Sequence, residues 1–86
     1  MKKYSYSLRD LINKVIWHPE LDRRKLEIKF IDRPEGVSSI KGDEIEEVGH
    51  KFVFAHVPIP YHRILEIKYE GKVIWRKGEK VDLSRI

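Results

Sequence analysis

The apolar residues of this 86-residue chain follow a helical period near the N-terminus, and this segment sets the fold class. Between positions 7 and 17 they recur three and four positions apart and form one stripe. The stripe consists of Leu8, Leu11, Ile12, Val15 and Ile16. Ser7 and Asp10 resemble a capping box with a shorter acid, and Pro19 disfavours helical geometry in the residue before it. We therefore predict one helix that starts after Ser7 and ends near Trp17.

The rest of the chain alternates between apolar and polar residues and is interrupted by glycine and proline. Residues 25–32 (KLEIKFID) alternate strictly, which predicts a half-buried strand, and Arg33-Pro34-Glu35-Gly36 has the composition of a turn. Further strands are expected over 37–40, 44–48, 51–55, 64–68 and 72–76. One helix followed by short strands predicts a single α+β domain over residues 1–86. In it, the N-terminal helix packs on a curved antiparallel sheet of four or five strands.

The last two predicted strands flank Gly71, and two loop lengths fit the sequence between them. A two-residue loop over 70–71 places Trp75 opposite Glu66. A three-residue loop over 69–71 pairs Trp75 with Leu65 and gathers the apolar residues on one face. Because register follows the buried face, we predict the three-residue loop.

The predicted register has a consequence for the polar face of this hairpin. Arg76 and Lys68 project from it, and His62, which lies two residues before the strand, points to the same side. We expect Trp75, together with Trp17 at the helix end, to lie in the core. The basic run 23–25 is expected to be solvated.

Two prolines precede an aromatic residue, a histidine and an arginine in the segment 57–64 (VPIPYHRI). Each proline fixes its own φ and disfavours helix in the residue before it, so 57–60 is expected to be a stiff, extended connector. Tyr61, His62 and Arg63 follow directly. Histidine protonates near neutral pH, and arginine offers a planar donor fork to phosphate. Tyr61 is equally suited to packing and to stacking under a base.

Composition narrows the function classes. The net charge is +4 and the pI is about 9.4, yet 37% of residues are charged, Gln, Thr and Cys are absent, and Asn13 is the one asparagine. This profile is typical of hyperthermophile proteins and raises the pI by itself, so the charge alone leaves an anionic partner open. The absence of cysteine excludes disulfides and thiolate metal sites. No apolar run suits a membrane span or signal peptide, and we expect a cytoplasmic protein.

The sequence offers little for catalysis or cofactors. Neither a dinucleotide-binding nor a P-loop pattern of glycines is present. His50, His56 and His62 are six residues apart and could share a face of an extended chain, but no second metal motif supports them. No histidine begins the H-x-S/T motif of the cyclic-phosphodiesterase fold. We therefore expect no metal and no cofactor.

Four stretches resemble a small, mostly archaeal family described as the RNA cyclic group end recognition domain. They are IWHP (16–19), FIDR (30–33), IPYHRI (59–64) and GKVIWRK (71–77). The family pattern has an acid after the tryptophan, where this chain has Arg76, and commonly a polar residue at position 61, where it has a tyrosine. The resemblance implies recognition of RNA ends such as a 2′,3′-cyclic phosphate.

We therefore expect a non-catalytic RNA-binding module for single-stranded RNA 3′ ends, acting in RNA repair or processing beside a partner enzyme. The expected RNA-binding residues are Arg33, Tyr61, His62, Arg63, Lys68 and Arg76. Two alternatives stay open. One is a protein-interaction subunit of an RNA-processing complex, which would use the hairpin edge for β-addition. The other is a metal-independent phosphoesterase. The sequence sets no oligomeric state.

Overall fold

The computed structural model describes residues 7–32 and 36–86, and its first element is the predicted helix. Helix α1 spans Leu8–Trp17. The Ser7 hydroxyl accepts a hydrogen bond of 3.2 Å from the amide of Asp10, and the Asp10 carboxylate accepts one of 2.8 Å from the amide of Ser7. This is the predicted capping box. The helix ends before Pro19, as predicted. Among the described residues, no helix has the length and hydrophobicity that a membrane span requires.

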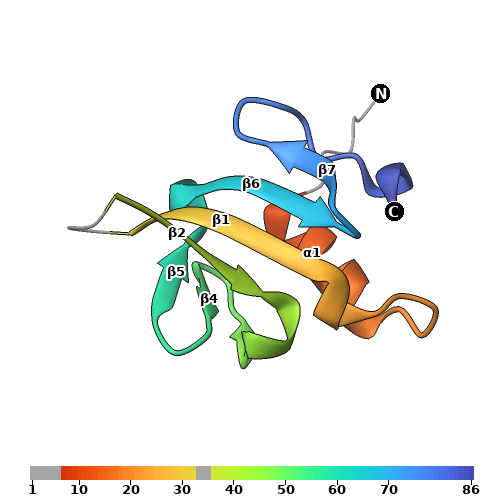
Figure 1. Cartoon of the computed structure of the whole chain (residues 1–86), viewed down its shortest axis with the longest axis horizontal. Coiled ribbons are helices and arrows are strands. Elements are labelled where there is room, and N and C mark those ends of the chain that lie inside the picture. The colour runs from red at the N-terminus through yellow and green to blue at the C-terminus, as the bar shows by residue number, and fades with distance from the viewer. Residues whose placement is uncertain (1–6, 33–35) are drawn as a thin grey trace.

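The described strands form two antiparallel sheets, with the orders β2-β1-β6-β7 and β3-β4-β5 (Figure 1). Their bounds are β1 (Leu26–Asp32), β2 (Gly36–Lys41), β3 (Glu47–Val48), β4 (Phe52–Phe54), β5 (Pro58–Pro60), β6 (Ile64–Tyr69) and β7 (Lys72–Arg76). Short 3-10 helices intervene, namely η1 (Arg23–Lys25), η2 (Gly42–Glu44), η3 (Tyr61–Arg63) and η4 (Leu83–Arg85). The predicted α+β class is confirmed, although the strands divide between two sheets.

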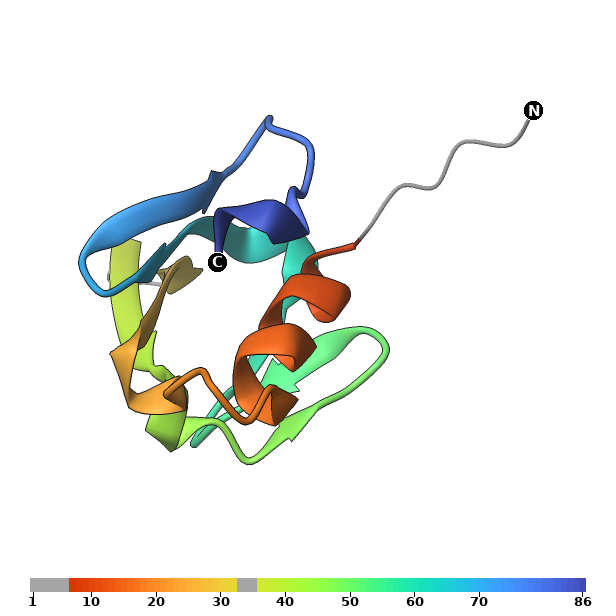
Figure 2. The same cartoon turned by 90° about the vertical axis from the view of Figure 1, so that its right-hand side faces the viewer.

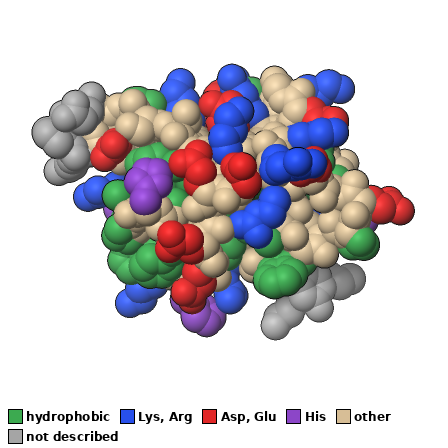
Figure 3. All heavy atoms as spheres, turned by 60° about the horizontal axis from the view of Figure 1, so that its bottom comes forward, with side chains coloured by type: hydrophobic (Ala, Val, Ile, Leu, Met, Phe, Trp, Pro, Cys, Tyr) green, Lys and Arg blue, Asp and Glu red, His purple; other side chains and the backbone are tan. Residues whose placement is uncertain are grey.

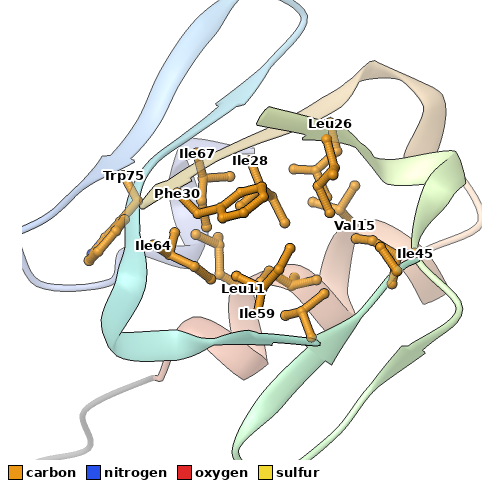
Figure 4. Close-up of a cluster of buried hydrophobic side chains, with 14 of the residues drawn as sticks. Leu11, Val15, Leu26, Ile28, Phe30, Ile45, Ile59, Ile64, Ile67 and Trp75 are labelled. Carbon is orange, nitrogen blue, oxygen red and sulfur yellow. The ribbon is translucent and has the colours of Figure 1, made fainter. Parts of the chain in front are cut away.

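The two sheets curve around α1 (Figure 2), and the apolar stripe of the helix packs in the common core. Leu11, Ile12 and Val15 of the helix are fully buried. Figure 4 shows helix residues pointing toward side chains of β1 and β6, including Ile28 and Ile67. Burial of one side chain of this size stabilises the fold by about 1.5–3 kcal/mol. The predicted stripe therefore supplies one side of the core.

The middle of the chain departs from the predicted strand pattern in two places. The strand expected over 44–48 is reduced to β3, because the chain first turns through η2, where Gly42 packs against η1. The proline segment is extended, as predicted, but it also pairs with β4 as β5. Prolines fit there because β5 is the edge of its sheet, and Ile59 between them is buried.

The predicted register of the last hairpin is wrong. The loop has two residues, Glu70 and Gly71, with φ of 53° and 81°, and Trp75 pairs with Ile67 instead of Leu65. A β-bulge at Ile74 explains the difference, because the extra residue lets Ile74 and Trp75 both be buried although they are adjacent in sequence. The bulge, rather than a longer loop, gathers the apolar residues.

Two further expectations concern the tryptophans and a turn. Trp75 lies in the core as predicted, but Trp17 is 77% exposed. Trp17 is two residues after the buried Val15, which on a helix points it away from the apolar stripe. Of the predicted turn 33–36, only Gly36 lies within the described residues, and its φ of 108° favours glycine.

Candidate nucleic-acid interface

Three of the stretches singled out in the sequence converge at one end of the four-stranded sheet. Because β1, β6 and β7 are antiparallel neighbours, β1 and β7 end where β6 begins (Figure 1). Phe30 pairs with Ile64, and Arg76 pairs with Glu66. The segments FIDR, IPYHRI and GKVIWRK therefore meet, whereas IWHP ends α1 and precedes the opposite end of β1.

The residues 61–63 form η3, a single turn between β5 and β6. Ile59 and Ile64 on either side of it are 1% and 0% exposed, so both ends of the turn are anchored in the core. The fixed φ of Pro60 begins the turn, and the amide of Tyr61 donates to the carbonyl of Lys51 at 3.4 Å. The prolines and isoleucines thus hold an exposed His62 in a defined position.

Tyr61 is a packing residue in this structure. Its hydroxyl donates a hydrogen bond of 2.6 Å to the carbonyl of Gly49, and its half-buried ring packs against the core. Burial raises the pKa of the Tyr61 hydroxyl above its usual value, which the nearby Arg9 guanidinium partly offsets and the Asp10 carboxylate reinforces. The tyrosine is therefore held at its outer end as well as along its ring.

One face of η3 borders an open hollow of about 440 Å³, lined by Lys51, Phe52, Pro60, Tyr61 and His62. The rings of Phe52, Tyr61 and Pro60 form its floor, and the side chains of Lys51 and His62 are exposed. Sequence analysis missed Lys51 and Phe52, because Phe52 begins β4, Lys51 directly precedes it, and both reach η3 only through the pairing of Phe52 with Pro60. The unpredicted pairing of β5 creates this hollow.

The end of β7 adds another cation that the sequence analysis did not select. Lys77 donates a hydrogen bond of 2.6 Å from its Nζ to the carbonyl of His62, and its amide donates to the carbonyl of Leu65 at 2.8 Å. Lys77 belongs to the stretch GKVIWRK, so its proximity to η3 was in principle detectable. It follows Arg76, which occupies the place of the family's acid.

Arg76 and Lys68 lie on β7 and β6, and Arg76 pairs with Glu66 instead of Ile64, which the predicted register required. Both approach Glu66, with nitrogen-to-oxygen distances of 3.4 Å and 3.9 Å. The register also places Lys29 opposite Glu66. Glu66, Lys29 and Lys68 line a separate hollow of about 230 Å³.

The remaining predicted site residues are Arg63 and Arg33. Arg63 is half-buried and immediately precedes Ile64, which pairs with Phe30, so Arg63 lies beside the last residues of β1. Arg33 lies outside the described residues. The structure thus brings Tyr61, His62 and Arg63 together on η3, whereas Lys68 and Arg76 approach the carboxylate of Glu66.

The described residues contain no cluster of three potential metal ligands, and His56 lies 3.8 Å from the Glu44 carboxylate. Figure 3 shows acidic side chains interspersed with basic ones over the face that it displays. That face therefore offers no continuous basic surface to an anion.

Comparison with known proteins identifies relatives that span most of the chain. It is 47% identical over 68 residues to a UPF0248 protein of Archaeoglobus fulgidus, an alignment that covers 77% of this chain and 99% of that one. It is 33% identical over 76 residues to the UPF0248 protein MJ1316 of Methanocaldococcus jannaschii, covering 84% and 95%. For the UPF0248 protein MK0350 of Methanopyrus kandleri the identity is 37% over 65 residues, covering 72% and 88%.

No solved structure matches the chain significantly. The archaeal relatives include thermophiles, in line with the composition. A family model described as the MJ1316 RNA cyclic group end recognition domain matches residues 2–77. This chain therefore belongs to the MJ1316 RNA cyclic group end recognition domain family, as its four sequence stretches predicted.

Proposed function

We propose that this protein binds the 3′ ends of single-stranded RNA, including ends that carry a 2′,3′-cyclic phosphate, and that it does so without catalysis. The observation that carries the proposal is the arrangement around η3. There, an exposed histidine and an exposed lysine border an aromatic-lined hollow, and Lys77 donates a hydrogen bond to the backbone of that histidine, at the place where three family stretches meet. The description of the family, which names RNA cyclic group ends, supports the same class of ligand.

The chemistry of a cyclic phosphate matches these parts. It is a compact monoanion on a five-membered ring, and its terminal ribose has no free 2′- or 3′-hydroxyl. Recognition therefore depends on donors to the two free phosphate oxygens and on an apolar surface for the base. In our proposal the terminal base lies over Phe52 and Pro60, and protonated His62 and Lys51 donate to the phosphate.

The other cations take secondary roles in this proposal. Lys77 holds η3 and adds positive charge beside His62. Arg63 contacts the end phosphate from the β1 side. Arg76 and Lys68 contact phosphates further along the strand more weakly, because Glu66 offsets part of their charge. Arg33, which lies outside the described residues, is included in the proposed site because it belongs to the stretch FIDR.

The decisive experiment compares three RNAs that differ only at the 3′ end, which carries a hydroxyl, a linear phosphate or a 2′,3′-cyclic phosphate. A linear phosphomonoester carries between one and two negative charges near neutral pH, because its second pKa is about 6. The cyclic diester carries one. A protein that binds by charge alone would prefer the linear end, whereas a site shaped for the ring prefers the cyclic end.

We expect fluorescence anisotropy to show the cyclic end bound several-fold more tightly than the linear end at low salt. Affinity for all three RNAs should fall as salt rises, because phosphate contacts release counterions. Equal or tighter binding of the linear end would leave only general RNA binding. Conversion of the cyclic end to a linear phosphate by metal-free protein would replace the proposal with a phosphoesterase.

A further inference from the structure

We infer that the opposite end of the molecule carries a second binding surface, which accepts a positively charged, extended segment of a partner protein. This surface, here called the Trp17 groove, is a hollow of about 250 Å³ between α1 and β3. The side chains that matter for its chemistry are Ile16, Trp17, Arg23, Glu46, Glu47 and Val48. Such a partner is independent of the proposed RNA ligand.

Trp17 provides the anchor of the groove. Its side chain is 77% exposed, the highest value among the large exposed hydrophobic residues of the described chain. Tryptophan is enriched among the residues that dominate binding at protein interfaces, and a tryptophan ring is also the preferred aromatic partner of a cation. Ile16 and Val48 are half-buried beside it and continue the apolar surface.

The other wall of the groove is the edge of a sheet. In the order β3-β4-β5, strand β3 has a neighbour on one side only, and α1 packs beside β3. A strand with one free edge can accept an extended segment through backbone hydrogen bonds. The hairpin edge at β7 is less open, because Arg85 donates to the carbonyl of Ile74 at 3.4 Å.

The charge of the groove selects a cationic occupant. Glu46 and Glu47 are exposed, and neither forms an ion pair with another described residue. The guanidinium of Arg23 donates instead to the carbonyls of Gly42 and Ile45, which fixes it in the wall. The two carboxylates outnumber it, so the groove repels phosphate and attracts lysine or arginine although the whole chain carries +4.

The position of the groove separates it from η3. Arg23 of the groove belongs to η1, directly before the first residue of β1, whereas η3 lies beside the last residues of that seven-residue strand. At a rise of about 3.3 Å per residue, the two ends of β1 are roughly 20 Å apart. On the β3 side the two surfaces are closer, because Val48 precedes Gly49, whose carbonyl accepts the hydrogen bond of Tyr61. A segment bound over Trp17 and Arg23 would leave His62 accessible to RNA.

The test uses the full chain and a capped synthetic peptide of alternating arginine and valine, with a matched peptide that has glutamate in place of arginine. In NMR titrations the arginine peptide should shift the indole N–H of Trp17 and the amides of β3 until saturation. The indole of buried Trp75 should not shift. Trp17→Ala should abolish the response, and Glu46→Gln combined with Glu47→Gln should weaken binding about tenfold. Glu70→Gln, which removes a carboxylate outside the groove, should bind as the wild type.

Several results would overturn the inference. They are the absence of saturable shifts at millimolar arginine peptide, equal binding of the glutamate peptide, a shift of Trp17 by single-stranded RNA, or a dimer that Trp17→Ala converts to a monomer. Two variants distinguish a failure of this inference from a failure of the proposed RNA-binding function. His62→Ala should bind the arginine peptide normally, and Trp17→Ala should bind RNA normally. An unchanged amide spectrum verifies that each variant is folded.

Discussion

The ammonium group of Lys77 donates a hydrogen bond of 2.6 Å to the backbone carbonyl of His62. The two residues come from different elements, since Lys77 directly follows β7 and His62 is the middle residue of η3. The contact places the ammonium group of Lys77 against the backbone of His62. It also ties the position of η3 to the correct pairing of β6 with β7.

Lys77→Met should therefore weaken RNA binding by about 1 kcal/mol, through the loss of one charge and of the restraint on η3. Stability should change little, because the lysine is exposed. Lys80→Met is the matched control, since it removes an exposed lysine from the same loop. If both variants bind RNA equally, Lys77 has no special part in the site.

The residues of η3 should contribute more than those on the basic run of η1. His62→Ala and Arg63→Ala should each weaken RNA binding by about 1–3 kcal/mol if they donate charge-assisted hydrogen bonds to phosphate. Arg24→Ala should cost much less, because its guanidinium is already paired with the Asp22 carboxylate at 3.0 Å. A folded His62→Ala protein with wild-type affinity would remove this residue from the proposed site.

The elements that sequence reasoning predicted best depend on local patterns. The capping box and stripe of α1 and the alternation of β1 involve residues within a few positions of each other, and both elements formed as predicted. The register of the hairpin depends instead on a bulge at Ile74, which no local pattern marks. For that reason Arg76 pairs with Glu66 instead of Ile64.

The candidate site was only partly predictable for a similar reason. His62 and Arg63 stand out because they follow the prolines, but Lys51 and Phe52 approach them only after β5 has paired with β4. Arg23 looked like part of a solvated basic run. It is instead half-buried, and its contacts lie about twenty residues further along the chain. Long-range pairing decides such positions, and a single sequence does not reveal it.

Arg23 should therefore matter for stability, and Arg24 should not. Arg23→Ala leaves the carbonyls of Gly42 and Ile45 without their donor, which should lower the free energy of unfolding by about 1–3 kcal/mol. Arg24→Ala removes an exposed ion pair and should leave the free energy of unfolding nearly unchanged. Guanidinium denaturation measures both, and equal effects would contradict the contacts seen here.

Glu70 adopts a φ of 53°, which a residue with a long side chain rarely takes. Asparagine tolerates this conformation and is preferred in two-residue hairpin loops before glycine. Glu70→Asn should therefore raise the free energy of unfolding by about 0.5–1 kcal/mol, despite losing the exposed ion pair with Lys25 at 2.9 Å. Lys25→Met, which removes the same ion pair and leaves the turn unchanged, measures that loss separately. Destabilisation by Glu70→Asn beyond that of Lys25→Met would argue against this turn.

Tyr61 links stability to alkaline pH. Burial raises the pKa of its hydroxyl in the folded protein above the value of about 10 that a tyrosine has when unfolded. Below pH 10 both states keep the proton and the stabilisation is complete. Above it the unfolded state loses the proton first, so the stabilisation declines until the pH passes the folded pKa.

Tyr61→Phe cannot ionise, but it loses the hydrogen bond to the carbonyl of Gly49. Near pH 8 it should be less stable than the wild type by about 1 kcal/mol. As the pH rises from about 9 to 11, the wild type should lose stability faster, and the difference between the two proteins should shrink. Denaturation curves of both proteins at a series of pH values measure this difference. The titration of the lysines, which both proteins share, cancels in it. A difference that stays constant or grows over this range would mean that the Tyr61 hydroxyl is not buried as the structure shows.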